Sequence, residues 1–118
     1  HRESLRMFHA AGGKLAMGTD AGTQYNFHGN SAYELHLLVE AGIPTRDALV
    51  SATGAAADLC RLPDRGRIAD GMLADLLVVP GDPLADIDAV ALASRHRLVV
   101  KAGEAVRRAE PAPSGQPA

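Results

Sequence analysis

The first stretch of the chain alternates apolar and polar positions in a way that predicts a helix and then a short strand. Over residues 2–11, Leu5 and Phe8 fall on one side at helical spacing, and a glycine pair ends the pattern. Residues 14–19 are a short apolar run between glycines, which is typical of a buried strand. We therefore expect a helix, a strand, and a loop that begins at Asp20.

A polar loop and three further helices follow in the pattern. The loop covers residues 20–30, and loops of this length within a compact domain are often functional. Apolar residues recur at helical spacing over residues 32–41, with Asn30 or Ser31 as the expected cap. A second helix is predicted to begin after Pro44, and a short third one over residues 55–60.

The second half of the chain predicts short strands. Residues 66–71 have the pattern of a brief strand and turn, and residues 74–79 are nearly continuous in apolar side chains. Residues 87–93 predict one helical turn. Residues 97–101 and 104–106 predict a hairpin closed by two small residues.

Together these elements predict an α/β protein in two units and a tail. Residues 1–61 form the end of a βα unit, residues 62–108 form a separate β region, and residues 109–118 form a disordered tail rich in Pro, Ala and Ser. A single strand cannot complete a parallel sheet, and the chain opens on His1 without an initiator methionine. We therefore expect a piece of a longer polypeptide.

Composition and charge exclude several kinds of partner. The net charge is -2 and no basic stripe occurs, so nothing predicts nucleic-acid binding. No run approaches the roughly 18 apolar residues of a membrane span. Cys60 is the single cysteine, which excludes an internal disulfide and suits a cytoplasmic protein. Secretion stays open, because a signal peptide could precede His1.

Asp20 is the first candidate for chemistry. It lies where the predicted strand gives way to the loop, the place where α/β proteins collect ligands and reacting groups. One interpretation is a carboxylate that binds a divalent metal such as Zn²⁺ and takes a proton from the metal-activated water. The other is an Asx-turn residue that only shapes the loop. The local sequence leaves both interpretations open.

His28 is the second candidate. It lies beside a glycine in the same loop and could contact a substrate or a metal, or could be a surface histidine packed on Tyr25 or Phe27. Glu34 and His36 are two residues apart on a predicted helix, so their side chains do not face each other and a shared site there is not expected.

Several short motifs, in order along the chain, resemble the metal-dependent amidohydrolase superfamily. The GTDAG motif at residues 18–22, with His28-Gly29 and Glu34-Leu35, resembles the last barrel strand and its loop. The segments that resemble the following helices and the small β domain are 41–43, 47–49, 52–53, 66–68, 71–76 and 81–84. Within the superfamily, the chain is most similar to imidazolonepropionase-like hydrolases and Xaa-Pro dipeptidases.

This resemblance implies a fold and a site. The chain would be the end of a (β/α)8 TIM barrel, with the last strand and the following helices, plus C-terminal strands of a small β-sandwich domain. One or two divalent ions, usually zinc, would lie at the barrel mouth. Asp20 would bind metal, accept a proton from the hydrolytic water and pass it to the leaving group. His28 would contact the substrate, and the other metal ligands would lie upstream of His1.

The function that the resemblance implies is hydrolysis of a C–N bond, in a dipeptide such as Xaa-Pro or in a cyclic amide. Two alternatives stay open: a deaminase of the same superfamily, and a non-catalytic structural piece or binding module for the isolated chain. The expected partner is a small-molecule or dipeptide substrate. We also expect a possible homo-oligomer, because a truncated barrel would expose apolar faces.

Overall fold

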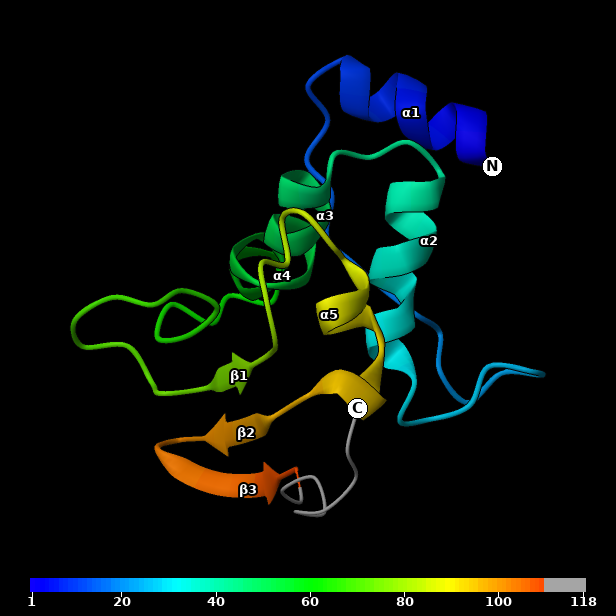
Figure 1. Ribbon diagram of the computed structural model, residues 1–118. Coiled ribbons are helices and arrows are strands. Elements are labelled where there is room, and N and C mark those ends of the chain that lie inside the picture. Colours follow the sequence, from blue (N-terminus) through cyan, green and yellow to red (C-terminus); the bar gives the residue numbers. More distant parts are fainter. Residues whose placement is uncertain (110–118) are drawn as a thin grey trace.

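A computed structural model describes residues 1–109 as a group of helices and a small sheet (Figure 1). The mixture of helix and sheet agrees with the predicted α/β class. Most of the predicted tail, residues 110–118, lies outside the described residues. The elements are α1 (Arg2–Ala10), η1 (Ser31–Tyr33), α2 (Glu34–Glu40), α3 (Thr45–Ala52), α4 (Gly54–Leu59), β1 (Leu76–Val78), α5 (Asp88–Ala91), η2 (Ala93–Arg95), β2 (Leu98–Lys101) and β3 (Glu104–Arg108).

The helices occur where the apolar periodicity predicts them, with one change. The helix predicted over residues 32–41 is divided into the 3-10 turn η1 and the α-helix α2. Asn30 is the residue before η1, but its side chain makes no capping hydrogen bond. Helix α3 begins directly after Pro44, whose fixed φ suits a helix start, and Asp47 lies in its first turn, where a carboxylate favours the helix dipole.

The core lies between α2, α3 and α5. Leu35 of α2 and Ile43 of the following loop are each 2% exposed, and Ala48 of α3 is fully buried. Ile87 and Ala91 complete this cluster from around α5. Burying a Leu or Ile side chain contributes about 1.5–3 kcal/mol. The core therefore joins residues from both predicted units, and the boundary predicted after residue 61 stays a prediction.

The strand predicted over residues 14–19 is wrong as a strand, since these residues are assigned to neither helix nor sheet. A strand needs a neighbour for its backbone hydrogen bonds, and none of residues 1–109 offers a ladder here. Burial still alternates with a period of two: Leu15 and Met17 are half-buried and pack on the core, whereas Ala16 and Gly18 are exposed. The segment thus keeps the side-chain pattern of a strand without its partners.

Of the brief strand and turn predicted over residues 66–71, the strand is wrong and the turn is present: the Met72 N–H donates to the Ala69 carbonyl at 3.2 Å. Gly66 has φ +83, and a Cβ there would come within 2.7 Å of the Ala57 side chain, so this segment packs closely on α4. Arg67 reaches Asp58 of α4 at 2.6 Å. These contacts tie the segment to a helix instead of to a sheet. The strand predicted over residues 74–79 is present but shortens to β1.

The sheet has the order β1-β2-β3, with both pairs antiparallel. Leu76 pairs with Val100 across β1 and β2, and the register shifts by a bulge after Val99 in the β2–β3 pair. The predicted hairpin is confirmed. Ala102 and Gly103 both have positive φ, at 49° and 85°, as the tight turns that suit twisted strands require. No helix within residues 1–109 is long and apolar enough to cross a bilayer.

Candidate active site

Asp20 ends the segment of residues 14–19 in an unusual backbone conformation. Its φ is 49°, in the left-handed region that side chains seldom adopt but that Asp tolerates better than most residues. The side chain is exposed and follows Ala16 and Gly18 in the alternation, away from the core. Among residues 1–109 no hydrogen bond or ion pair engages its carboxylate. This acid is therefore free to meet a ligand, and backbone strain of this kind clusters at functional sites.

A network of hydrogen bonds folds the loop back behind Asp20. The Thr23 N–H donates to the Asp20 carbonyl at 3.3 Å, and the Asn26 N–H donates to the Thr23 carbonyl at 3.0 Å. The Gly22 N–H donates to the Asn26 carbonyl at 2.8 Å. The Asn26 side-chain amide donates to the Thr19 carbonyl. Asn26 was not among the residues predicted for the site, and its only signal in the sequence is the general preference of Asn for turns.

His28 lies against the same loop. A Cβ placed on Gly22 would stand 2.8 Å from the His28 Nε2, so the imidazole rests on the glycine backbone two residues after Asp20. His28 is exposed, as the alternative of a surface histidine expects, but no ring stacking joins it to Tyr25 or Phe27, which are 85% and 76% exposed, within residues 1–109. The structure thus places both candidate side chains on one loop.

The next acid along the chain, Glu34, begins α2 and is half-buried. Burial raises the pKa of its carboxyl above the usual value. His36 turns elsewhere: its Nδ1 lies 2.7 Å from Asp88 Oδ1, and its ring stacks on Tyr33 with centroids 5.1 Å apart. The expectation that Glu34 and His36 do not share a site agrees with these contacts.

The side chains near Asp20 supply only part of what a divalent metal site needs. Structural and catalytic zinc sites need three or four protein ligands. Residues 1–109 contain no group of three or more His, Cys, Asp or Glu side chains placed to hold a metal ion. The exposed, unpaired carboxylate of Asp20 suits one coordination position. Any further ligands would have to come from outside the described residues.

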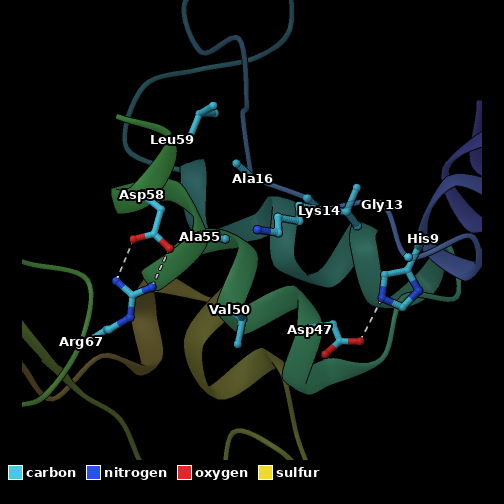
Figure 2. Close-up of a pocket in the computed structure, with 12 residues that line it drawn as sticks. His9, Gly13, Lys14, Ala16, Asp47, Val50, Ala55, Asp58, Leu59 and Arg67 are labelled. Atoms are coloured by element: carbon cyan, nitrogen blue, oxygen red, sulfur yellow. Dashed lines mark hydrogen bonds and ion pairs between the residues drawn. The ribbon is translucent and has the colours of Figure 1, made fainter. Parts of the chain in front are cut away.

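A cavity of about 780 Å³ lies away from these residues, between α1, α3 and α4 (Figure 2). Lys14 projects into it, and two polar pairs bound it: His9 Nε2 with Asp47 Oδ2 at 2.9 Å, and Arg67 with Asp58 at 2.6 and 3.0 Å. The Arg67 guanidinium holds the pKa of Asp58 below its usual value. Neither candidate side chain lines this cavity, so it is separate from the loop of Asp20.

Comparisons with known proteins agree on one family. The model of the amidohydrolase family matches residues 1–106. A prolidase solved in complex with N-methylphosphonate-L-proline is 35% identical, with a TM-score of 0.81 over 92% of this chain and 26% of that chain. An Xaa-Pro dipeptidase with methionine bound in its active site is 37% identical, with a TM-score of 0.77 over 88% of this chain and 25% of that chain.

A third solved structure, described as a putative prolidase from Bifidobacterium longum, is 34% identical, with a TM-score of 0.81 over 94% of this chain and 27% of that chain. The chain thus spans about a quarter of the length of these solved structures. None of the curated proteins matches it.

Proposed function

Because the chain belongs to the amidohydrolase family, we propose that it is the C-terminal part of a metal-dependent hydrolase that cleaves a C–N bond. The favoured substrate is a dipeptide such as Xaa-Pro, with a cyclic amide as the other possibility. Membership in the family agrees with the resemblance found in the sequence. The observation that carries the proposal is the free, exposed carboxylate of Asp20, held in a left-handed turn at the end of a strand-like segment.

We propose that residues 14–19 form the last strand of a (β/α)8 barrel in the complete enzyme, the full polypeptide that includes these residues. The alternation of burial supports this. Leu15 and Met17 turn towards the helices, as the outer face of a barrel strand does, and Ala16 and Gly18 turn to the other side. Asp20 would then lie at the C-terminal mouth of the barrel, where active sites of this fold are found.

Asp20 would hold the metal together with ligands from outside the described residues. When bound, the ion, which we expect to be zinc, would polarise the scissile carbonyl and acidify the attacking water. The Asp20 carboxylate would accept the proton that this water loses as its oxygen bonds to the carbonyl carbon. It would then return the proton to the leaving nitrogen as the C–N bond breaks. One carboxylate thus serves as base and then as acid.

His28 would contact the substrate. Its imidazole rests on Gly22, two residues after Asp20, and so lies on the loop that follows the reacting carboxylate. A neutral imidazole offers one donor and one acceptor nitrogen, which suits the amide or carboxylate groups of a dipeptide. We assign His28 to binding and not to the metal.

Asp20→Asn in the complete enzyme tests this function. The amide keeps the shape of the carboxylate but cannot accept the proton, so we expect kcat to fall by about 10²–10⁴-fold. The fold should stay intact, because no hydrogen bond or ion pair among residues 1–109 engages the Asp20 side chain. Steady-state kinetics, metal analysis and thermal melts measure this. Near wild-type kcat with metal bound would exclude Asp20 as the proton carrier.

A substrate panel tests the reaction class. We expect hydrolysis of Xaa-Pro and other dipeptides, or of cyclic amides, when each is incubated with the complete enzyme. Amino-purines belong in the same panel. Release of ammonia from the amino-purines, without cleavage of the dipeptides or cyclic amides, would show that the enzyme is a deaminase of the same superfamily.

A further inference from the structure

We infer that Asn26 is a positioning residue for Asp20: its side-chain amide, held on the Thr19 carbonyl, fixes the left-handed turn from which Asp20 presents its carboxylate. This inference rests on the function proposed for Asp20. It assigns to Asn26 no contact with the substrate or with the metal.

Two peptide planes flank the Asp20 Cα, and each is held by a hydrogen bond. The Thr19 carbonyl belongs to the plane before it, and the Asn26 amide holds that plane. The Asp20 carbonyl belongs to the plane after it, and the Thr23 N–H holds that one at 3.3 Å. Because peptide units are planar, fixing both planes fixes the φ and ψ of Asp20 and hence the direction of its side chain.

These restraints are needed because the conformation is unfavourable. With φ at 49°, Asp20 lies outside the broad regions that residues with a Cβ prefer. Such a backbone persists where its surroundings over-determine it. Without the amide of Asn26, the turn would relax towards a more populated region and the carboxylate would change direction.

The contact needs a side-chain donor at this position. Asn26 is half-buried, and the bond to Thr19 uses an N–H of its side chain. An ionised aspartate at this position would set an acceptor against the carbonyl oxygen. The backbone carbonyl of Asn26 also accepts the Gly22 N–H at 2.8 Å, and Gly22 supports the His28 ring. Asn26 therefore joins the two candidate side chains into one rigid loop.

Two substitutions in the complete enzyme test the inference, Asn26→Ala and the isosteric Asn26→Asp. We expect kcat per bound metal to fall about 10²-fold in both, as for a misplaced reacting group, with the fold retained. Asn30→Asp is the matched control, because Asn30 lies exposed in the same loop and its side chain makes no capping bond. It should keep wild-type kinetics. Wild-type kcat in both Asn26 variants would overturn the inference.

A double-mutant cycle separates positioning from simple structural support. If Asn26 acts through Asp20, then Asn26→Ala should cause no further loss of kcat in an enzyme that already carries Asp20→Asn. Additive losses would show that Asn26 acts independently, and would overturn the inference. If Asp20→Asn alone keeps wild-type kcat, the proposed function fails instead, and the exchange measurement decides the role of Asn26.

Hydrogen–deuterium exchange reads the loop without any turnover. The Gly22 and Thr23 amides are hydrogen-bonded in the intact loop. We expect them to exchange at least about fivefold faster in Asn26→Ala, as for loss of one hydrogen bond, and at the wild-type rate in Asn30→Asp. Unchanged exchange in Asn26→Ala would show that the amide does not hold the turn.

Discussion

Gly22 stands between the two side chains to which we assign the chemistry. Its φ is +99, and a Cβ there would lie 2.8 Å from the His28 Nε2. Gly29, in the same loop, has a similar φ of +91 but nothing within 4 Å of the same position. A comparison of alanine substitutions at the two glycines therefore separates two effects. Both substitutions strain the backbone, but only the one at Gly22 displaces the His28 imidazole.

We expect Gly22→Ala to raise KM about tenfold, equivalent to about 1.4 kcal/mol of binding energy, because it pushes His28 off the loop. Both Gly22→Ala and Gly29→Ala should destabilise the enzyme by about 1–3 kcal/mol, the cost of a side chain at such φ values. Only Gly22→Ala should change KM. Denaturant unfolding measures the loss of stability, and steady-state kinetics measure KM. Equal KM values in the two variants would show that His28 does not bind the substrate.

For single residues, the sequence could identify Asp20 and His28 as candidates but could not identify Asn26. Asn26 and Asn30 are the same residue type in the same loop. Both suit turns, and local preference does not say which one folds back on the strand end. The choice depends on the path of the whole loop, which is set by backbone hydrogen bonds that the residue pattern does not encode.

The pair of Arg67 and Asp58 ties the segment after α4 to that helix. Arg67 holds the pKa of the Asp58 carboxyl below its usual 3.8. The folded state therefore releases this proton at a lower pH than the unfolded chain does. The stabilisation that this pair gives the folded state is fully present above the pKa that Asp58 has in the unfolded chain. It is lost as the pH falls through the lower pKa that Asp58 has in the folded state.

At pH 7 we expect the wild-type protein to have a slightly higher melting temperature than Asp58→Asn. This difference in melting temperature should vanish as the pH falls below 3.8. The effect should be small, since exposed ion pairs are screened by solvent. Asp64→Asn is the control: Asp64 pairs with its neighbour Arg65, a contact that the unfolded chain can also form. Melting curves across pH measure both variants. A difference that grows on acidification would contradict the assignment.

Whether an element was predictable depended on where its hydrogen-bond partners lie. The hairpin of β2 and β3 contains its own partner strand, so its local pattern was sufficient. Residues 14–19 have the apolar run of a strand but would need neighbours far away in the sequence, and none is present among the described residues. Residues 66–71 were wrongly assigned because an ion pair and a glycine contact with α4 determine their path. The position of α5 on α2 was equally hidden, because four residues do not identify the helix they pack against.

For the molecule as a whole, the main feature is how much apolar surface stays open. Both the sheet and the segments around it leave large apolar side chains uncovered, and surfaces of this kind are typical of sites where other protein surfaces pack. In a complete enzyme, other parts of the polypeptide would cover them. The side chains concerned are Ile68, Leu73, Leu76, Leu77, Val78, Leu84 and Val106.

We therefore expect the isolated 118-residue chain to self-associate in solution and to show no hydrolysis of dipeptides with added Zn²⁺. A single carboxylate does not make a zinc site, and residues 1–109 hold no cluster of three ligands. Light scattering and an activity assay measure the two outcomes. Turnover by this chain alone that Asp20→Asn abolishes would show that the site is complete without other residues.

Residues 14–19, whose backbone has few hydrogen-bond partners, also suggest a place at which the polypeptide can be divided into two pieces. These residues keep the side-chain alternation of a strand, while among residues 1–109 most of their backbone groups have no hydrogen-bond partner. The Met17 N–H donates to the Ser51 carbonyl at 2.9 Å. If residues 14–19 are the last barrel strand, as proposed, a longer polypeptide divided just before α1 would leave one piece ending in an incomplete sheet and a second, shorter piece offering the missing edge. Such a division suits a split enzyme, in which catalysis reports that two separately expressed pieces have met.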